Sequence, residues 1–176
     1  MIKIICLLSA CIAQLYCANP VSSSTKEKAE THFTVDSLQP QEFFTLSNAE
    51  KVLGEPAHLA DSTSTIEQDV LTYRYTFTAN AGDPRTRRGN IYFLLGIHPN
   101  VESAQADYTT TRNANASLDG MEDLGDQAYF HTDSENFYFI MVRKGANILR
   151  MKVNRITRTT SLNEFNAVAK EICRHL

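Results

Sequence analysis

The chain has few cysteines, and three of its four, Cys6, Cys11 and Cys17, lie within the first 17 residues. Cys173 is the only cysteine after that point, and one cysteine cannot form an internal disulfide. This excludes the disulfide-stapled scaffolds that are common among small exported domains. The stability of the folded part must therefore come from a hydrophobic core. Because Cys173 lies among apolar residues in an amphipathic segment, we expect a small buried side chain rather than a reactive thiol.

The chain also lacks a long hydrophobic run. After Lys3, residues 4–13 form an apolar stretch of about ten residues, whereas a membrane-spanning helix needs about twenty. A positive start followed by a short apolar stretch is typical of a signal peptide, which we predict over 1–17. Residues 18–31 are small, polar or charged, so we expect a flexible tether there. A single domain is then expected over 32–176.

The processing of this leader has three alternatives. Residues 8–11 (LSAC) resemble the bacterial lipobox, in which the cysteine becomes acylated, whereas Cys17 gives a more usual leader length. Ordinary cleavage after Ala13 would instead release a soluble, secreted form. We favour lipidation at Cys17, with Cys11 as the alternative. The expected location is therefore a lipid-anchored position in the bacterial cell envelope, or otherwise the periplasm or the medium.

An excess of positive charge is absent too. Of the 17 basic residues only Lys3 lies in the leader, so the mature part has 16 basic and 20 acidic residues and a net charge of −4. Nucleic-acid-binding domains are usually strongly basic, so we expect no nucleic-acid partner.

The common catalytic signatures are missing from the sequence: it has no G-x-S-x-G, phosphate-loop, H-E-x-x-H or G-x-G-x-x-G motif. Its five histidines are scattered, and the acidic residues of 119–126 do not follow the calcium-loop order. We therefore predict no metal, no cofactor and no enzymatic activity, with an enzyme of unfamiliar type as a remaining alternative.

Alternation of apolar and polar residues predicts an antiparallel sheet. In residues 70–79, Leu71, Tyr73, Tyr75 and Phe77 share one face and polar residues share the other. Further strands are expected over 91–97, 128–131, 137–143 and 148–153, whereas the polar residues before Val70 are expected to form a loop.

Capping signals predict three helices. The first starts at Ser47, which forms a capping box with Glu50, and ends at Gly54; the second is capped by Asn100. The third follows Ser161 and repeats apolar residues at three- and four-residue steps. The expected fold class is α+β, a two-layer sandwich with an antiparallel sheet and the helices packed on one face.

Two groups of basic residues are candidate binding sites. Arg85, Arg87 and Arg88 lie in the loop after the first predicted strand, where they could bind an anion or anionic lipid. Arg150 and Lys152 belong to a basic stretch over 143–158 that could dock a partner or form a solvated outer face. The aromatic residues of the strands could line an apolar pocket or belong to the core; they are Tyr73, Tyr75, Tyr92, Phe137 and Phe139.

Two segments resemble known families. Residues 48–56 (NAEKVLGEP) with the Tyr73-Arg74-Tyr75 strand are similar to the helix–Leu-Gly-x-Pro–strand unit of small outer-membrane assembly lipoproteins of the SmpA/OmlA type. Residues 124–130 (LGDQAYF) resemble a loop-to-strand segment of exported lipoproteins with a PsbP-like α+β sandwich. These resemblances imply a small envelope protein.

The sequence therefore favours a non-enzymatic exported protein that binds a protein or a cell-envelope component. The alternative is a periplasmic or secreted module that binds an apolar or anionic small molecule.

Overall fold

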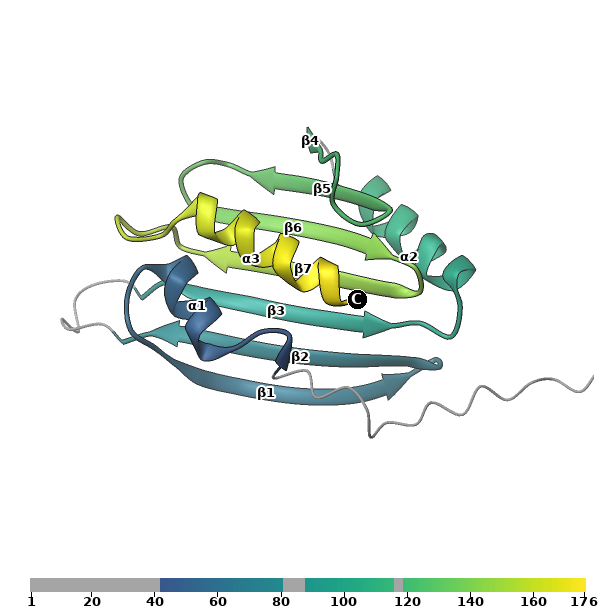
Figure 1. Ribbon diagram of the computed structural model, residues 1–176, viewed down its shortest axis with the longest axis horizontal. Coiled ribbons are helices and arrows are strands. Elements are labelled where there is room, and N and C mark those ends of the chain that lie inside the picture. The colour runs from purple at the N-terminus through teal and green to yellow at the C-terminus, as the bar shows by residue number, and fades with distance from the viewer. Residues whose placement is uncertain (1–41, 81–87, 116–118) are drawn as a thin grey trace, which may run out of the picture. The chain divides into compact units, whose positions relative to one another are not determined.

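The computed structural model describes residues 42–80, 88–115 and 119–176, which form one antiparallel sheet and three helices (Figure 1). The sheet has seven strands in the order β1-β2-β3-β7-β6-β5-β4. Its strands are β1 (Ala57–Glu67), β2 (Val70–Ala79), β3 (Asn90–Ile97), β4 (Asp119–Gly120), β5 (Gln127–Thr132), β6 (Phe137–Lys144) and β7 (Asn147–Asn154). The helices are α1 (Leu46–Leu53), α2 (Val101–Asn113) and α3 (Leu162–His175). The predicted α+β class and antiparallel sheet are confirmed.

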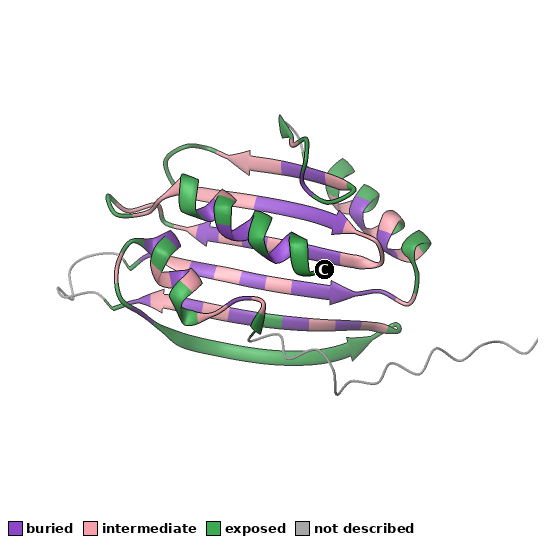
Figure 2. Cartoon of the chain, viewed as in Figure 1, coloured by how far each residue is buried: buried purple, intermediate pink, exposed green. Residues whose placement is uncertain are grey.

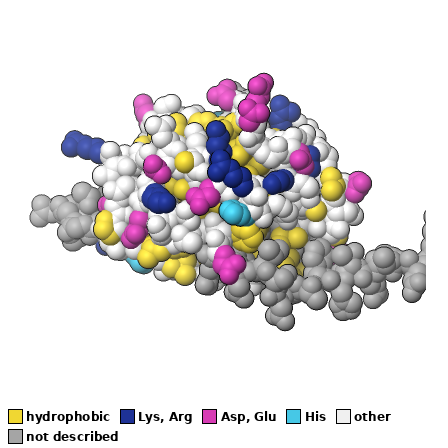
Figure 3. Space-filling view, viewed as in Figure 1, with side chains coloured by type: hydrophobic (Ala, Val, Ile, Leu, Met, Phe, Trp, Pro, Cys, Tyr) yellow, Lys and Arg dark blue, Asp and Glu magenta, His cyan; other side chains and the backbone are white. Residues whose placement is uncertain are grey.

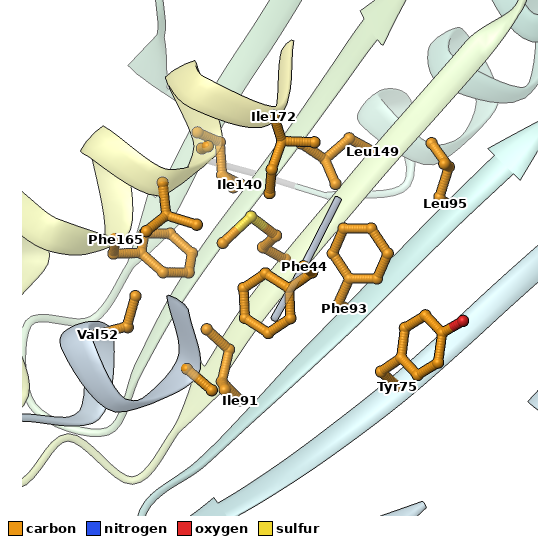
Figure 4. Packing of buried hydrophobic residues seen from close by; sticks show 14 of the residues in the cluster. Phe44, Val52, Tyr75, Ile91, Phe93, Leu95, Ile140, Leu149, Phe165 and Ile172 are labelled. Atoms are coloured by element: carbon orange, nitrogen blue, oxygen red, sulfur yellow. The ribbon is translucent and has the colours of Figure 1, made fainter. Parts of the chain in front are cut away.

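The main core lies between one face of the sheet and the helices α1 and α3 (Figure 1). Figure 4 shows how Phe44, just before α1, meets Phe93 of β3 in this layer. The two rings are stacked with centroids 5.1 Å apart, and Phe44 also makes an edge-to-face contact with Phe77 of β2. Phe165 and Ile172 of α3 complete the layer, as the apolar spacing of this helix predicts.

The third helix departs from the prediction, because α2 packs on the opposite face of the sheet. A second cluster forms there between Ala104 and Tyr108 of α2 and the strand residues Tyr129, Met141 and Ile148. The physical reason lies in β6, which carries apolar side chains on both faces. One helical layer can cover only one of these faces, so the other needs its own helix.

The first helix starts earlier than the capping box at Ser47 predicts. Thr45 is the N-cap: its side chain accepts a hydrogen bond from the backbone of Asn48, whose own side chain accepts from the backbone of Thr45. Asn48 thus takes the role expected of Glu50. The predicted end is confirmed, since Gly54 has a left-handed φ of 70° and a Cβ there would meet the Thr159 carbonyl.

The expected loop before Val70 is instead the eleven-residue strand β1. Every β1 residue after Ala57 is exposed, as its green colour in Figure 2 shows. Serine and threonine on both faces give no apolar alternation, so the strand has no signal in the sequence. A two-residue turn joins β1 to β2, with positive φ at Gln68 and Asp69, as type I′ hairpins require.

The remaining elements agree with the prediction, except for the two-residue strand β4, which was not predicted. The alternating strand 70–79 is β2, and the four apolar residues of its predicted face, Leu71, Tyr73, Tyr75 and Phe77, are buried. Asn100 caps α2 and Ser161 caps α3. In β7, Leu149, Met151 and Val153 are buried, and Arg150 and Lys152 are partly exposed. Among the described residues, no helix is long and apolar enough to cross a membrane.

Candidate functional site

Half-exposed aromatic and basic side chains meet on the α2 side of the sheet. Tyr92, Lys152, Phe139 and His131 are neighbours in one row across β3, β7, β6 and β5, and Phe137 lies two residues before Phe139. Directly opposed residues of adjacent strands point to the same face. All five side chains are partly exposed. We name these five residues the aromatic–basic patch.

Contacts between rings, and between a ring and a cation, connect the side chains of this patch. The Lys152 ammonium lies 5.3 Å from the centre of the Phe137 ring, within the range of a cation–π interaction. The His131 and Phe137 rings are 5.1 Å apart, and the Tyr92 hydroxyl accepts a hydrogen bond from Asn90. The patch therefore presents a cation held over an aromatic surface, with a hydroxyl group on its border.

The turn between β5 and β6 sets the position of the patch. One oxygen of the Asp133 carboxylate accepts backbone N–H groups of Glu135, Asn136 and Phe137, and the other accepts the Asn136 side chain. These hydrogen bonds, chiefly those from Asn136, hold the pKa of Asp133 well below its ordinary value. The backbone at Phe137 is thereby fixed as it enters β6.

Next to the patch, a charged cluster joins α2 to the sheet. One Arg150 nitrogen (Nη2) donates to both carboxylate oxygens of Asp107, at 2.8 and 2.9 Å, and contacts Thr111 at 3.3 Å. His98 Nε2 lies 3.3 Å from the same carboxylate. The Arg150 side chain is 27% exposed, so this ion pair is partly shielded from water. This ion pair connects α2 to β7.

His98 is buried within this cluster, and its Nδ1 atom has no hydrogen-bond partner among the described residues. Burial lowers the pKa of His98 and outweighs the attraction of Asp107. The neutral imidazole is therefore favoured. The Thr111 hydroxyl donates to Asp107 and accepts from Arg150, so it is bonded to both charged partners. The geometry suits a structural anchor better than an acid–base site.

Beneath the cluster, two tyrosines pack between α2 and the sheet. The rings of Tyr108 and Tyr129 are 5.8 Å apart, and the Tyr129 hydroxyl contacts the Met141 sulfur at 3.3 Å. Burial raises the pKa of both tyrosines. They remain neutral at ordinary pH and contribute to packing.

The structure separates the residues that the sequence grouped as candidates. Arg85 and Arg87 lie outside the described residues, as do both candidate lipidation sites, Cys17 and Cys11. Arg88 is described and exposed, just before β3. The candidate aromatic residues divide between the two faces of the sheet: Tyr73 and Tyr75 belong to the α1–α3 core, whereas the other three lie in the patch.

The basic stretch over 143–158 is not one continuous surface. Arg143 is buried and paired with Asp126 at 2.7 Å, and Lys144 donates to the Cys173 carbonyl at the end of α3. Arg150 is held by Asp107, Lys152 belongs to the patch, and Arg155 and Arg158 are exposed. Sequence alone could not find these partners, because each lies on a distant segment of the chain.

A hollow lies at the C-terminal end of α3. It has a volume of about 400 Å³ and is lined by the acidic loop, Lys144, Lys170, Cys173 and Arg174. Figure 3, which views the side covered by α1 and α3, shows cationic and acidic side chains interspersed on this face. Burial raises the pKa of the Cys173 thiol to about 11, in agreement with the expected buried cysteine.

Within residues 42–80, 88–115 and 119–176, no three histidine, cysteine or carboxylate side chains gather as a metal site would require. Comparison of the chain with protein-family models, with curated proteins and with solved structures finds no match.

Proposed function

We propose that this is a non-enzymatic exported protein that binds a protein or a cell-envelope component through the aromatic–basic patch. The signal-peptide-like leader and the polar tether support export, and the cysteines Cys17 or Cys11 would provide a lipid anchor in the envelope. In this location the domain would meet its partner close to the membrane surface.

The observation that carries the proposal is the patch itself. Aromatic side chains are enriched at the centres of protein interfaces. Tyr92, Phe137 and Phe139 are partly exposed, whereas Phe77, Phe93 and Tyr129 of the same sheet are buried. All five patch residues lie on paired strands of the sheet, so their backbone is already ordered. Binding would therefore immobilise few additional side chains.

Affinity capture from detergent-solubilised membranes of the native host tests this proposal. The full chain should capture a specific partner, and Lys152→Glu should abolish the capture by placing a carboxylate over the Phe137 ring. Lys170→Glu makes the same charge change on α3, far from the patch, and should leave capture intact. Equal capture by both variants, or no specific partner at all, would contradict the proposal.

The lipid anchor has its own test. The intact mass of the mature protein should show acylation that is lost in Cys17→Ser or, for the alternative site, in Cys11→Ser. A plain peptide mass beginning near Gln14 would instead mean a secreted form.

A second candidate function is the binding of an anionic small molecule in the hollow beside α3. Lys170 and Arg174 line it and take part in no ion pair within the described residues. A bound phosphate or carboxylate would raise the melting temperature, and Lys170→Ala with Arg174→Ala should remove that rise. The exposed Lys51→Ala on α1 is the matched control. An unchanged melting temperature with inorganic phosphate and with citrate would count against this function.

A further inference from the structure

The two edges of the sheet are protected very differently. One edge is β4, a strand of two residues, and such short edges offer little backbone for pairing. The other edge is β1, with eleven residues and no neighbour on its outer side among the described residues. Natural proteins usually interrupt long edges with lysine, proline or a bulge. In β1 the only irregularity lies between Leu59 and Asp61, near its start.

The hydrogen-bond pattern shows which backbone groups of β1 are unpaired. Asn80 donates to Pro56 on the β1 side, whereas Ala79 donates to Gly89 on the β3 side. Even-numbered residues of β2 therefore bond toward β1. Their partners after the irregularity are odd-numbered, from Asp61 to Glu67. The residues between them direct their N–H and C=O groups outward; they are Ser62, Ser64 and Ile66.

The side chains of β1 support the same conclusion. Ile66 and Leu59 are 65% and 44% exposed, and the register with β2 places both on the α1–α3 side of the sheet. Asp61 and Glu67 lie on the opposite side, six residues apart. From residue 59 to 73 the chain has three acidic residues and no basic one. An added strand would therefore meet Ile66 and two serines on one face. On the other it would meet the two carboxylates, with Arg74 one strand further in.

We propose that β1 accepts an extended polypeptide segment of a partner protein as an eighth strand, with basic residues facing Asp61 and Glu67. Pairing of extended segments with exposed strand edges is a recurrent mode of recognition, in which the backbone supplies affinity and side chains supply specificity. This site is separate from the aromatic–basic patch and does not depend on it.

The charges disfavour a second copy of the chain as the occupant. Antiparallel self-pairing centred on Ser64 uses all three outward-facing residues, because Ser62 then lies opposite Ile66 of the other copy. The same register places Asp61 opposite Glu67 at both ends of the pair. Like charges directly opposite each other destabilise a strand pair. A basic partner segment avoids this repulsion.

A synthetic nonapeptide, Thr-Lys-Val-Thr-Val-Thr-Val-Lys-Thr, is a direct probe. In the antiparallel register its lysines lie opposite Glu67 and Asp61, and its first valine lies opposite Ile66. Fluorescence anisotropy of the labelled peptide with the full chain should show saturable binding. The same peptide with glutamate in place of both lysines should bind at least about tenfold more weakly.

Two variants locate the binding on β1. Ser64→Pro removes an outward N–H group without touching a bond to β2, so it should weaken binding by about tenfold or more, whereas Ser64→Ala should not. Because a proline variant could misfold, the charge reversal Asp61→Lys with Glu67→Lys gives an independent test. It should invert the preference, so that the glutamate peptide binds better than the lysine peptide.

Several outcomes would overturn the proposal. These are no binding of the lysine peptide, equal binding of both peptides, or binding that Lys152→Glu removes and Ser64→Pro does not. A concentration-dependent dimer in sedimentation that Ser64→Pro disperses would also overturn it, because the edge would then bind a second copy.

Discussion

The two faces of the sheet differ in how completely they are covered. On one face, α1 and α3 lie over a continuous apolar layer in which Phe93 and Phe165 are fully buried. On the other, α2 packs on β6 and β7 around a small cluster, and the aromatic rings beyond it stay half-exposed. The first face therefore accounts for most of the stability, and the second leaves specific side chains available for binding. Four predictions test this comparison.

Truncation of a core ring should have the largest effect. Phe165→Ala removes a fully buried side chain from α3 and should lower the free energy of unfolding by about 3–5 kcal/mol. Phe139→Ala, the matched change on the patch, should cost about 1–2 kcal/mol because its ring is already partly in water. Urea unfolding of both variants measures the difference. Equal losses would mean that the two faces contribute alike.

Disruption of the Asp107–Arg150 ion pair should have an intermediate effect. Arg150→Ala leaves a half-exposed carboxylate without its main partner and should cost about 1–2 kcal/mol. Asp107→Asn should cost a similar amount, and the double variant should cost less than the two single variants together. Additive losses in the double-mutant cycle would show that the pair does not anchor α2.

The sequence predicted those parts of the fold that have a regular apolar pattern. The strand β2 and the helix α3 follow from alternation and from apolar spacing, and Gly54 follows from its place after a helix. The edge strand β1 was missed, because a strand exposed on both faces has no periodicity and forms only by pairing with β2.

The candidate site was only partly predictable. Lys152, Phe137 and Phe139 were identified as candidates, but their contact in one patch depends on the register between β6 and β7. The partner of Arg150 lies 43 residues away on α2, and no local pattern connects the two. The helix α2 was expected on the same face as α1 and α3. That prediction did not take into account that the apolar residues on the second face of β6 also need a helix to bury them.

Stability should depend on pH through His98. Burial lowers its pKa below the ordinary value of 6.5, so the unfolded chain binds the proton more readily than the folded one. Stability is therefore fully present above that ordinary value and falls as the pH drops toward the folded-state pKa. His98→Gln should flatten this part of the profile in urea unfolding. An unchanged slope would show that His98 titrates as freely in the folded state.

The smallest expected effect concerns the turn at the exposed edge. Gln68 and Asp69 adopt positive φ angles that glycine and asparagine tolerate better. Asp69→Gly should therefore stabilise the protein by at most about 1 kcal/mol, and Ile66→Ala should change stability by no more than about 0.5 kcal/mol. Thermal unfolding measures both. A large loss in Ile66→Ala would contradict the exposed position of this side chain.

Site-specific photo-crosslinking in cells tests the central claim most directly. A photoreactive phenylalanine analogue at Tyr92, in the patch, should form a specific crosslinked product with a partner in the envelope. The same analogue at Lys170, on the face covered by α1 and α3, should form none. A product at Lys170 with none at Tyr92 would contradict the assignment of the α2 face as the binding surface.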